Sequence, residues 1–172
     1  MREFGTHRLS YGRGFGAGWR RRGALLGLLA AGALAAGCAG APKPVVTQVT
    51  LTLVGAADVN PDARGRASPL TVRVYALKAP AAFEASDFFS LFDKDTATLG
   101  AEMAQRQEVL LRPGQTHKLE MTLPADVTHL GIMAAYRDLD RARWREVRAL
   151  QVGKPLVLDA TFAAREIRLQ QK

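Results

Sequence analysis

From residue 45 onwards, apolar and polar side chains alternate with a period of two in one short run after another. In the first run Val49, Leu51 and Leu53 share one side of an extended chain, and polar residues occupy the other side. The runs cover residues 45–54, 69–77, 106–111, 118–123, 129–136, 144–150, 156–162 and, more weakly, 166–169. About eight strands that each hide one face predict an all-β fold, a β-sandwich of two sheets packed face to face.

A turn, Arg112-Pro113-Gly114-Gln115, separates two of these runs. Proline and glycine together favour a tight reversal of the chain. A tight turn between two alternating runs is typical of a β-hairpin. We therefore expect the strands at 106–111 and 118–123 to pair with each other.

Residues 81–95 break the alternation and predict a short helical insertion after the second strand, at about residues 81–104. Several large apolar residues here recur at the spacing of one helix face, and Ser86 is a suitable N-cap. These apolar residues are Phe83, Phe88, Leu91 and Phe92. We expect the helix to seal an open end of the sandwich, because large apolar side chains are usually buried. The alternative is an exposed aromatic patch that docks a partner.

The first 37 residues have the parts of an export signal, in the usual order. Three arginines at 20–22 precede an apolar run at 24–36, and small residues at 35–37 lead into Cys38. The apolar run is shorter than the roughly 20 residues that cross a bilayer. The junction resembles a bacterial lipobox, in which the chain is cut before the cysteine and the thiol is acylated.

Cys38 is the only cysteine of the chain, so it has no disulfide partner within it. We therefore expect lipidation of Cys38, and two or more acyl chains would anchor it stably. An ordinary secretory signal with a cysteine nearby by chance is the alternative. The prediction has three parts: a cleaved signal peptide at 1–37, a lipidated N-terminus and tether at 38–44, and a β-sandwich domain at 45–172.

The net charge of +8 comes mostly from the signal peptide, which holds six of the 24 basic residues and one of the 16 acidic ones. The remaining 135 residues carry 18 basic and 15 acidic side chains, a net charge of +3. This part has no clustered stripe of the kind that neutralises phosphates. We therefore expect no nucleic acid partner.

The sequence contains none of the common catalytic or metal-binding motifs. The chain has no Gly-x-Ser-x-Gly elbow and no glycine-rich phosphate loop. His117 and His129 have no metal-ligand spacing. Asp93 and Asp95 begin like a calcium loop, but Ala97 stands where the next ligand is required. We expect no enzyme, no cofactor, no metal and no small-molecule substrate.

The loop at residues 56–68 is longer than the 2–5 residues usual between paired strands. A loop of this length is either disordered or functional. The sequence Asn-Pro-Asp at 60–62 favours a defined turn, so we expect a binding loop.

Several motifs, in the same order along the chain, resemble the outer-membrane lipoprotein of the type VI secretion system, the TssJ family, also called VasD or SciN. The motifs are Asn60-Pro61-Asp62-x-x-Gly65-Arg66-x-Ser68-Pro69-Leu70, Val72-Arg73-Val74-Tyr75, Leu130-Gly131-x-x-Ala134-Ala135-Tyr136-Arg137-Asp138 and Ala142-x-Trp144-Arg145. The resemblance implies a transthyretin-like β-sandwich held by its lipid on the periplasmic face of the outer membrane.

The resemblance also implies a role in protein secretion without catalysis. The lipoprotein would bind the periplasmic C-terminal region of TssM, the inner-membrane component, to assemble the trans-envelope complex. The loop at 56–68 would be a main contact, with Asn60, Asp62, Arg64 and Arg66 touching the partner and Pro61 and Gly65 holding the shape.

Two other functions remain open at this point. A periplasmic lipoprotein that binds a small ligand or a cell-wall sugar would need an aromatic-lined pocket. A transthyretin-like hydrolase would need His117 and His129 to converge in a cleft.

Overall fold

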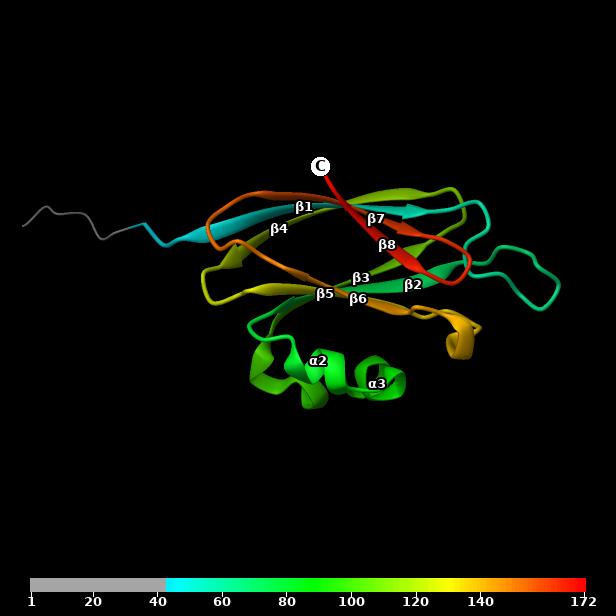
Figure 1. Ribbon diagram of the computed structural model, residues 1–172, viewed down its shortest axis with the longest axis horizontal. Coiled ribbons are helices and arrows are strands. Elements are labelled where there is room, and N and C mark those ends of the chain that lie inside the picture. The colour runs from blue at the N-terminus through cyan, green and yellow to red at the C-terminus, as the bar shows by residue number, and fades with distance from the viewer. Residues whose placement is uncertain (1–42) are drawn as a thin grey trace, which may run out of the picture. The chain divides into compact units, whose positions relative to one another are not determined.

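The structure is a computed structural model that describes residues 43–172. The predictions for the signal peptide, for Cys38 and for most of the tether lie outside these residues. Two four-stranded sheets pack face to face, in the orders β4-β1-β7-β8 and β3-β2-β5-β6 (Figure 1). The strands are β1 Val46–Gly55, β2 Leu70–Leu77, β3 Met103–Leu111, β4 Thr116–Pro124, β5 His129–Ala134, β6 Arg145–Ala149, β7 Leu156–Phe162 and β8 Ile167–Gln171. The predicted all-β sandwich is confirmed.

The pairing of the strands gives the sandwich two different ends. β1 runs parallel to β7, with Gly55 opposite Phe162, so the connections that follow both strands emerge at the same end. β5 also finishes there, because Ala134 lies opposite Val72 near the start of β2. We call this the loop end. The opposite end, where Lys43 leads into β1, is the tether end.

The main core lies between the two sheets. Leu51 and Leu53 of β1 and Val72 of β2 are fully buried, and so is Ile132 of β5. Residues with the opposite parity point away from this core, because successive side chains of a strand alternate between its two faces. The alternation in the sequence therefore identified the inner faces correctly.

The predicted hairpin at Pro113-Gly114 is wrong. β3 pairs with β2, whereas β4 pairs with β1 in the other sheet, so the turn crosses between the sheets. Two backbone bonds hold the turn to the end of β1: Gly114 N–H donates to Gly55 O and Gly55 N–H donates to Gln115 O, both at 2.9 Å. A tight turn fixes a reversal of the chain but does not decide which sheet receives the next strand.

The insertion contains two helices, α2 Ala81–Ala85 and α3 Phe88–Leu99, and a 3₁₀ turn, η2 Gly100–Glu102. The prediction of Ser86 as an N-cap is wrong, because Ser86 ends α2. Asp87 caps α3 instead. Its carboxylate accepts the Ser90 N–H at 2.9 Å and the Ser90 hydroxyl at 2.6 Å, and an anion there also suits the helix dipole.

The helices form a third layer on the outer face of the β3-β2-β5-β6 sheet (Figure 1). They do not seal an open end, so that prediction is wrong. Tyr75 and Leu77 of β2 and Met133 of β5 point outwards from the sheet and pack with Phe83 of α2. A Cβ on Gly131 would lie 2.9 Å from Leu77 and 3.1 Å from Phe83, so a glycine there allows α2 to approach the sheet.

Candidate functional site

Asn60 holds the loop at 56–68 in place from inside. Its φ of +49° is a left-handed conformation that asparagine adopts more readily than most residues. Its amide nitrogen donates to Pro69 O, and its amide oxygen accepts the Arg137 N–H, both at 2.8 Å. The side chain is 3% exposed. Asn60 was predicted to be a partner contact; in the structure it is buried and shapes the loop.

Asp62 organises the tip of the loop. Its Oδ1 accepts the backbone N–H groups of Arg64 and Arg66, both at 2.9 Å, and its Oδ2 lies 2.7 Å from the guanidinium of Arg66. Gly65 has φ +78°, which favours glycine, and its N–H donates to Asp62 O at 2.9 Å. The side-chain bond from Arg66 is the main cause that lowers the pKa of Asp62 below its ordinary value. The Asp62 carboxylate is therefore negatively charged, and its hydrogen bonds to residues 64 and 66 hold the turn at the tip of the loop.

The surface of this tip is basic. Arg64 and Arg66 are exposed, with 70% of the Arg66 side chain open to solvent, and Pro61 is partly exposed. Arginine presents a planar fork of donors that suits carboxylates. The Arg66 fork is held by Asp62, so a braced tip that presents Arg64 can bind an acidic segment without first becoming ordered.

An open groove of about 560 Å³ lies beside the tip. Pro61 and Gly65 line one side, Arg137 and Arg141 line the other, and Arg165 contributes from the turn between β7 and β8. Three loops that are distant in the sequence thus share one recess at the loop end. The sequence predicted a contact in the loop at 56–68 and did not predict that residues 137–141 and Arg165 line a groove beside it.

Asp138 fixes the second wall of the groove. Its Oδ2 accepts from Arg165 Nε at 2.8 Å and lies 3.9 Å from Arg141, which belongs to the 3₁₀ turn η3, Leu139–Arg141. Tyr136 is buried beneath this wall, and its hydroxyl donates to Glu166 O at 2.8 Å. Burial raises the pKa of Tyr136, so the hydroxyl stays a donor at neutral pH.

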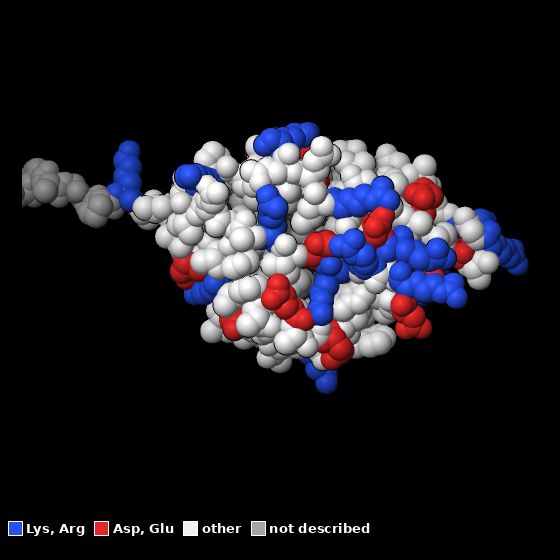
Figure 2. Space-filling model, in the orientation of Figure 1, with Lys and Arg blue, Asp and Glu red and all other residues white. Residues whose placement is uncertain are grey.

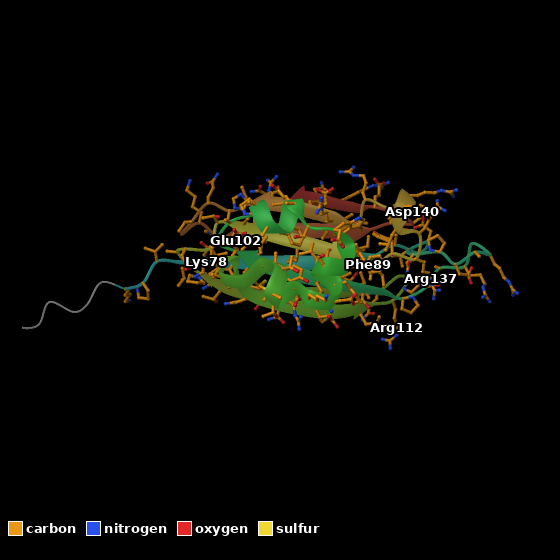
Figure 3. All side chains as sticks on the ribbon, turned by 90° about the horizontal axis from the view of Figure 1, so that it is seen from below. Lys78, Phe89, Glu102, Arg112, Arg137 and Asp140 are labelled. Atoms are coloured by element: carbon orange, nitrogen blue, oxygen red, sulfur yellow. The ribbon has the colours of Figure 1, made fainter. Side chains whose placement is uncertain are left out.

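Arginine dominates the charge of the loop end. Figure 2 shows basic side chains gathered toward this end, and Figure 3 places Arg112 and Arg137 there together with Asp140. The arginines of the loop-end connections are Arg64, Arg66, Arg112, Arg137, Arg141, Arg143 and Arg165, and the acidic residues are Asp58, Asp62, Asp138, Asp140 and Glu166. The excess of positive charge favours a negatively charged partner, and arginine is enriched among interface hot spots.

The two histidines of the sandwich lie at opposite ends of the molecule. His117 lies opposite Leu53 near the loop end, whereas His129 lies opposite Leu77 at the tether end of the other sheet. The two histidines cannot converge as a hydrolase would need. Within residues 43–172 no cluster of three metal-binding side chains occurs. None of the helices in this part of the chain is long and apolar enough to cross a membrane.

The chain is similar to a family of known proteins over most of its described length. A family model described as Type VI secretion lipoprotein, VasD, EvfM, TssJ matches residues 47–171. The crystal structure of the T6SS lipoprotein TssJ1 from Pseudomonas aeruginosa is 41% identical, with a TM-score of 0.72 over 75% of this chain and 97% of that chain. A search of curated proteins found no match.

Two more distant solved structures have the same fold. Lip from Serratia marcescens, a membrane-bound component of the type VI secretion system, is 26% identical, with a TM-score of 0.65 over 75% of this chain and 98% of that chain. A chain in a structure of the T6SS protein TssM C-terminal domain from EAEC is 22% identical. Its TM-score is 0.59 over 72% of this chain and 97% of that chain, which shows that the fold recurs there.

Proposed function

Because this chain belongs to the type VI secretion lipoprotein family, we propose that it anchors the membrane complex of that system to the outer membrane. In this proposal residues 1–37 are removed, Cys38 carries the lipid, and residues 38–44 tether the sandwich to the periplasmic face. The sandwich binds the periplasmic C-terminal region of an inner-membrane TssM-family protein. Its role is assembly without catalysis.

One observation carries the proposal for the binding site: the braced, arginine-rich loop end lies opposite the end where Lys43 enters β1. A lipid on Cys38 holds the tether end toward the outer membrane. The loop end then faces the periplasm, where a partner from the inner membrane arrives. The partner contacts are the tip residues Pro61, Asp62, Arg64, Gly65 and Arg66 together with the groove wall, whereas Asn60 supports them from below.

The test is a binding measurement between the detergent-solubilised lipoprotein and the purified periplasmic C-terminal region of the cognate TssM-family protein. Arg64→Glu reverses a charge at the exposed tip, where only the backbone of Arg64 takes part in the Asp62 turn. We expect it to weaken binding by about tenfold or more, and we expect added salt to weaken wild-type binding as well.

Lys154→Glu is the matched control, because it makes the same charge change on an exposed residue at the tether end. It should leave the dissociation constant within about twofold of the wild-type value. Equal loss for both variants, or no loss for Arg64→Glu in a protein that unfolds like the wild type, would remove the loop end from the interface.

A further inference from the structure

The tether end carries an exposed apolar ridge. Six large apolar residues within residues 43–172 are exposed to solvent, and three of them lie here. Their exposed fractions are 56% for Val45, 38% for Val46 and 41% for Val152. The ridge is held by the turn between β6 and β7. Gly153 N–H donates to the Thr47 hydroxyl oxygen at 2.9 Å, and the Gly153 Cα side of the turn lies against Val45. These valines are therefore presented on ordered backbone.

Basic side chains without a carboxylate partner in the described part of the chain lie at the same end of the sandwich as this ridge, and one of them, Arg148, donates a hydrogen bond to Gln171. They are Lys43, Arg148 and Lys154. Arg148 and Lys154 line an open groove of about 580 Å³ beside the turn, together with the apolar Leu150 and Pro155.

Two other lysines at this end form ion pairs. Lys78 pairs with Asp126 at 2.8 Å, and Lys172 pairs with Asp159 at 2.9 Å. The Glu102 carboxylate accepts the Ala82 N–H at 3.2 Å, and Figure 3 shows Glu102 beside Lys78. The basic side chains that line the groove beside the turn, Arg148 and Lys154, form no ion pair in the described part of the chain, so they complement an anionic surface.

The length of the tether restricts what this end can meet. Four residues lie between Cys38 and Lys43, and the five steps of an extended chain span at most about 3.6 Å each, so the tether reaches no farther than about 18 Å. The headgroup region of one leaflet is itself roughly 5–8 Å thick. A lipidated Cys38 therefore keeps the ridge within the reach of this short tether from the membrane. The headgroups are then present at a high effective concentration around the ridge.

We propose that the tether end is a second binding surface, which rests on the membrane and takes anionic phospholipid headgroups. Val45, Val46 and Val152 lie at the apolar boundary, and Lys43, Arg148 and Lys154 contact phosphates. This surface rests on the proposed anchor at Cys38. It fixes the orientation of the sandwich relative to the membrane. The loop end then points away from the membrane instead of sampling all directions at the end of a flexible tether.

The test uses the full lipoprotein, acylated and reconstituted in vesicles of phosphatidylethanolamine and phosphatidylglycerol that contain a nitroxide-labelled headgroup lipid. A Val152→Cys variant, and separately an Ala63→Cys variant at the loop tip, are labelled with a fluorophore, since the acylated Cys38 has no free thiol. We expect strong quenching of the probe at position 152 and little at position 63. Adding Arg148→Glu and Lys154→Glu should cut the quenching at position 152 at least by half, as should vesicles without phosphatidylglycerol.

Equal quenching at both positions, or quenching at position 152 that ignores both the charge reversals and the lipid charge, would overturn the proposal. Quenching that falls as the protein-to-lipid ratio rises would assign the ridge to a second copy of the chain instead. Mass spectrometry of the mature N-terminus and flotation of the vesicles separate the two proposals. An unacylated chain that does not float overturns the anchor and this surface together, whereas an acylated, floating chain with equal quenching overturns this surface alone.

Discussion

At the scale of single residues, the buried Asn60 connects the two walls of the groove at the loop end. It joins the start of β2, through Pro69 O, to the groove wall, through Arg137 N–H. Both bonds are to backbone groups, so they fix where the two walls of the groove stand relative to each other. The charged tip residues depend on this frame, and their sequence pattern did not reveal it.

We expect Asn60→Ala to lower the free energy of unfolding by about 2–4 kcal/mol. The change leaves a buried N–H and a carbonyl without their partners, at about 1–3 kcal/mol each, and forces alanine into a left-handed conformation. Asn60→Gly removes the bonds but relieves the backbone strain, so its loss should be smaller. Urea unfolding of the two variants measures both effects, and wild-type stability in both would refute this role of Asn60.

At the loop end, a local sequence motif predicts the turn but not the residues that pack beside it. Pro61, Asp62, Gly65 and Arg66 stand in one short motif, so a local turn could be expected from the sequence. Arg165 joins the same groove only because β7 runs parallel to β1. Such a pairing depends on residues more than 90 positions apart, and no local pattern encodes it.

At the scale of elements, α3 is attached to the sheet by a buried carboxylate. Asp95 is 5% exposed, and its Oδ2 accepts from Arg106 at 2.7 Å and from the Tyr75 hydroxyl at 3.2 Å. Burial alone would raise the pKa of Asp95, but the bond and charge of Arg106 outweigh it and hold the pKa below its ordinary value. Burial raises the pKa of Tyr75 to about 12, so its hydroxyl remains a donor.

Replacing Asp95 by asparagine should lower the free energy of unfolding by about 1–3 kcal/mol at pH 7, since Arg106 is partly exposed and its charge is screened. The folded pKa lies below the unfolded pKa. The contribution of Asp95 is therefore complete above about pH 5 and is lost as the pH falls through the lowered folded value. The difference between wild type and Asp95→Asn should shrink toward pH 3.

Asp93→Asn is the matched control for Asp95, because Asp93 is an exposed aspartate on the same helix. It should change the stability by less than about 0.5 kcal/mol at either pH. A difference for Asp95→Asn that stays constant between pH 7 and pH 3 would contradict the assigned sign of the pKa shift.

The strands were predictable to within a few residues, whereas their neighbours and the place of the helices were not. Alternation identifies an inner face, and the β2 residues Val72 and Val74 lie there. Tyr75 and Leu77 are also buried, on the opposite face, which is the signature of a strand covered on both sides. A strand with apolar residues on both faces must be covered on both sides. Which part of the chain covers the second face depends on tertiary packing, and here it is the helical insertion.

At the scale of the whole molecule, anchoring and partner binding are assigned to opposite ends and should be separable. We expect Cys38→Ser to move the protein from the membrane fraction to the soluble periplasmic fraction and to abolish secretion. The purified variant should bind the TssM-family region with unchanged affinity, because the loop end is intact. Membrane fractionation and the binding measurement together test this, and a variant that still floats with the outer membrane would exclude lipidation as the anchor.

The ten-residue strand β1 begins at the tether end and finishes where the loop at 56–68 starts. In the proposed arrangement, tension that the partner exerts on this loop therefore passes along β1. β1 lies in the middle of its sheet, bonded along its length to β4 on one side and β7 on the other. Because β1 is already extended, load between its two ends passes along its covalent backbone, and the bonds to β4 and β7 keep the strand in the sheet while it carries that load.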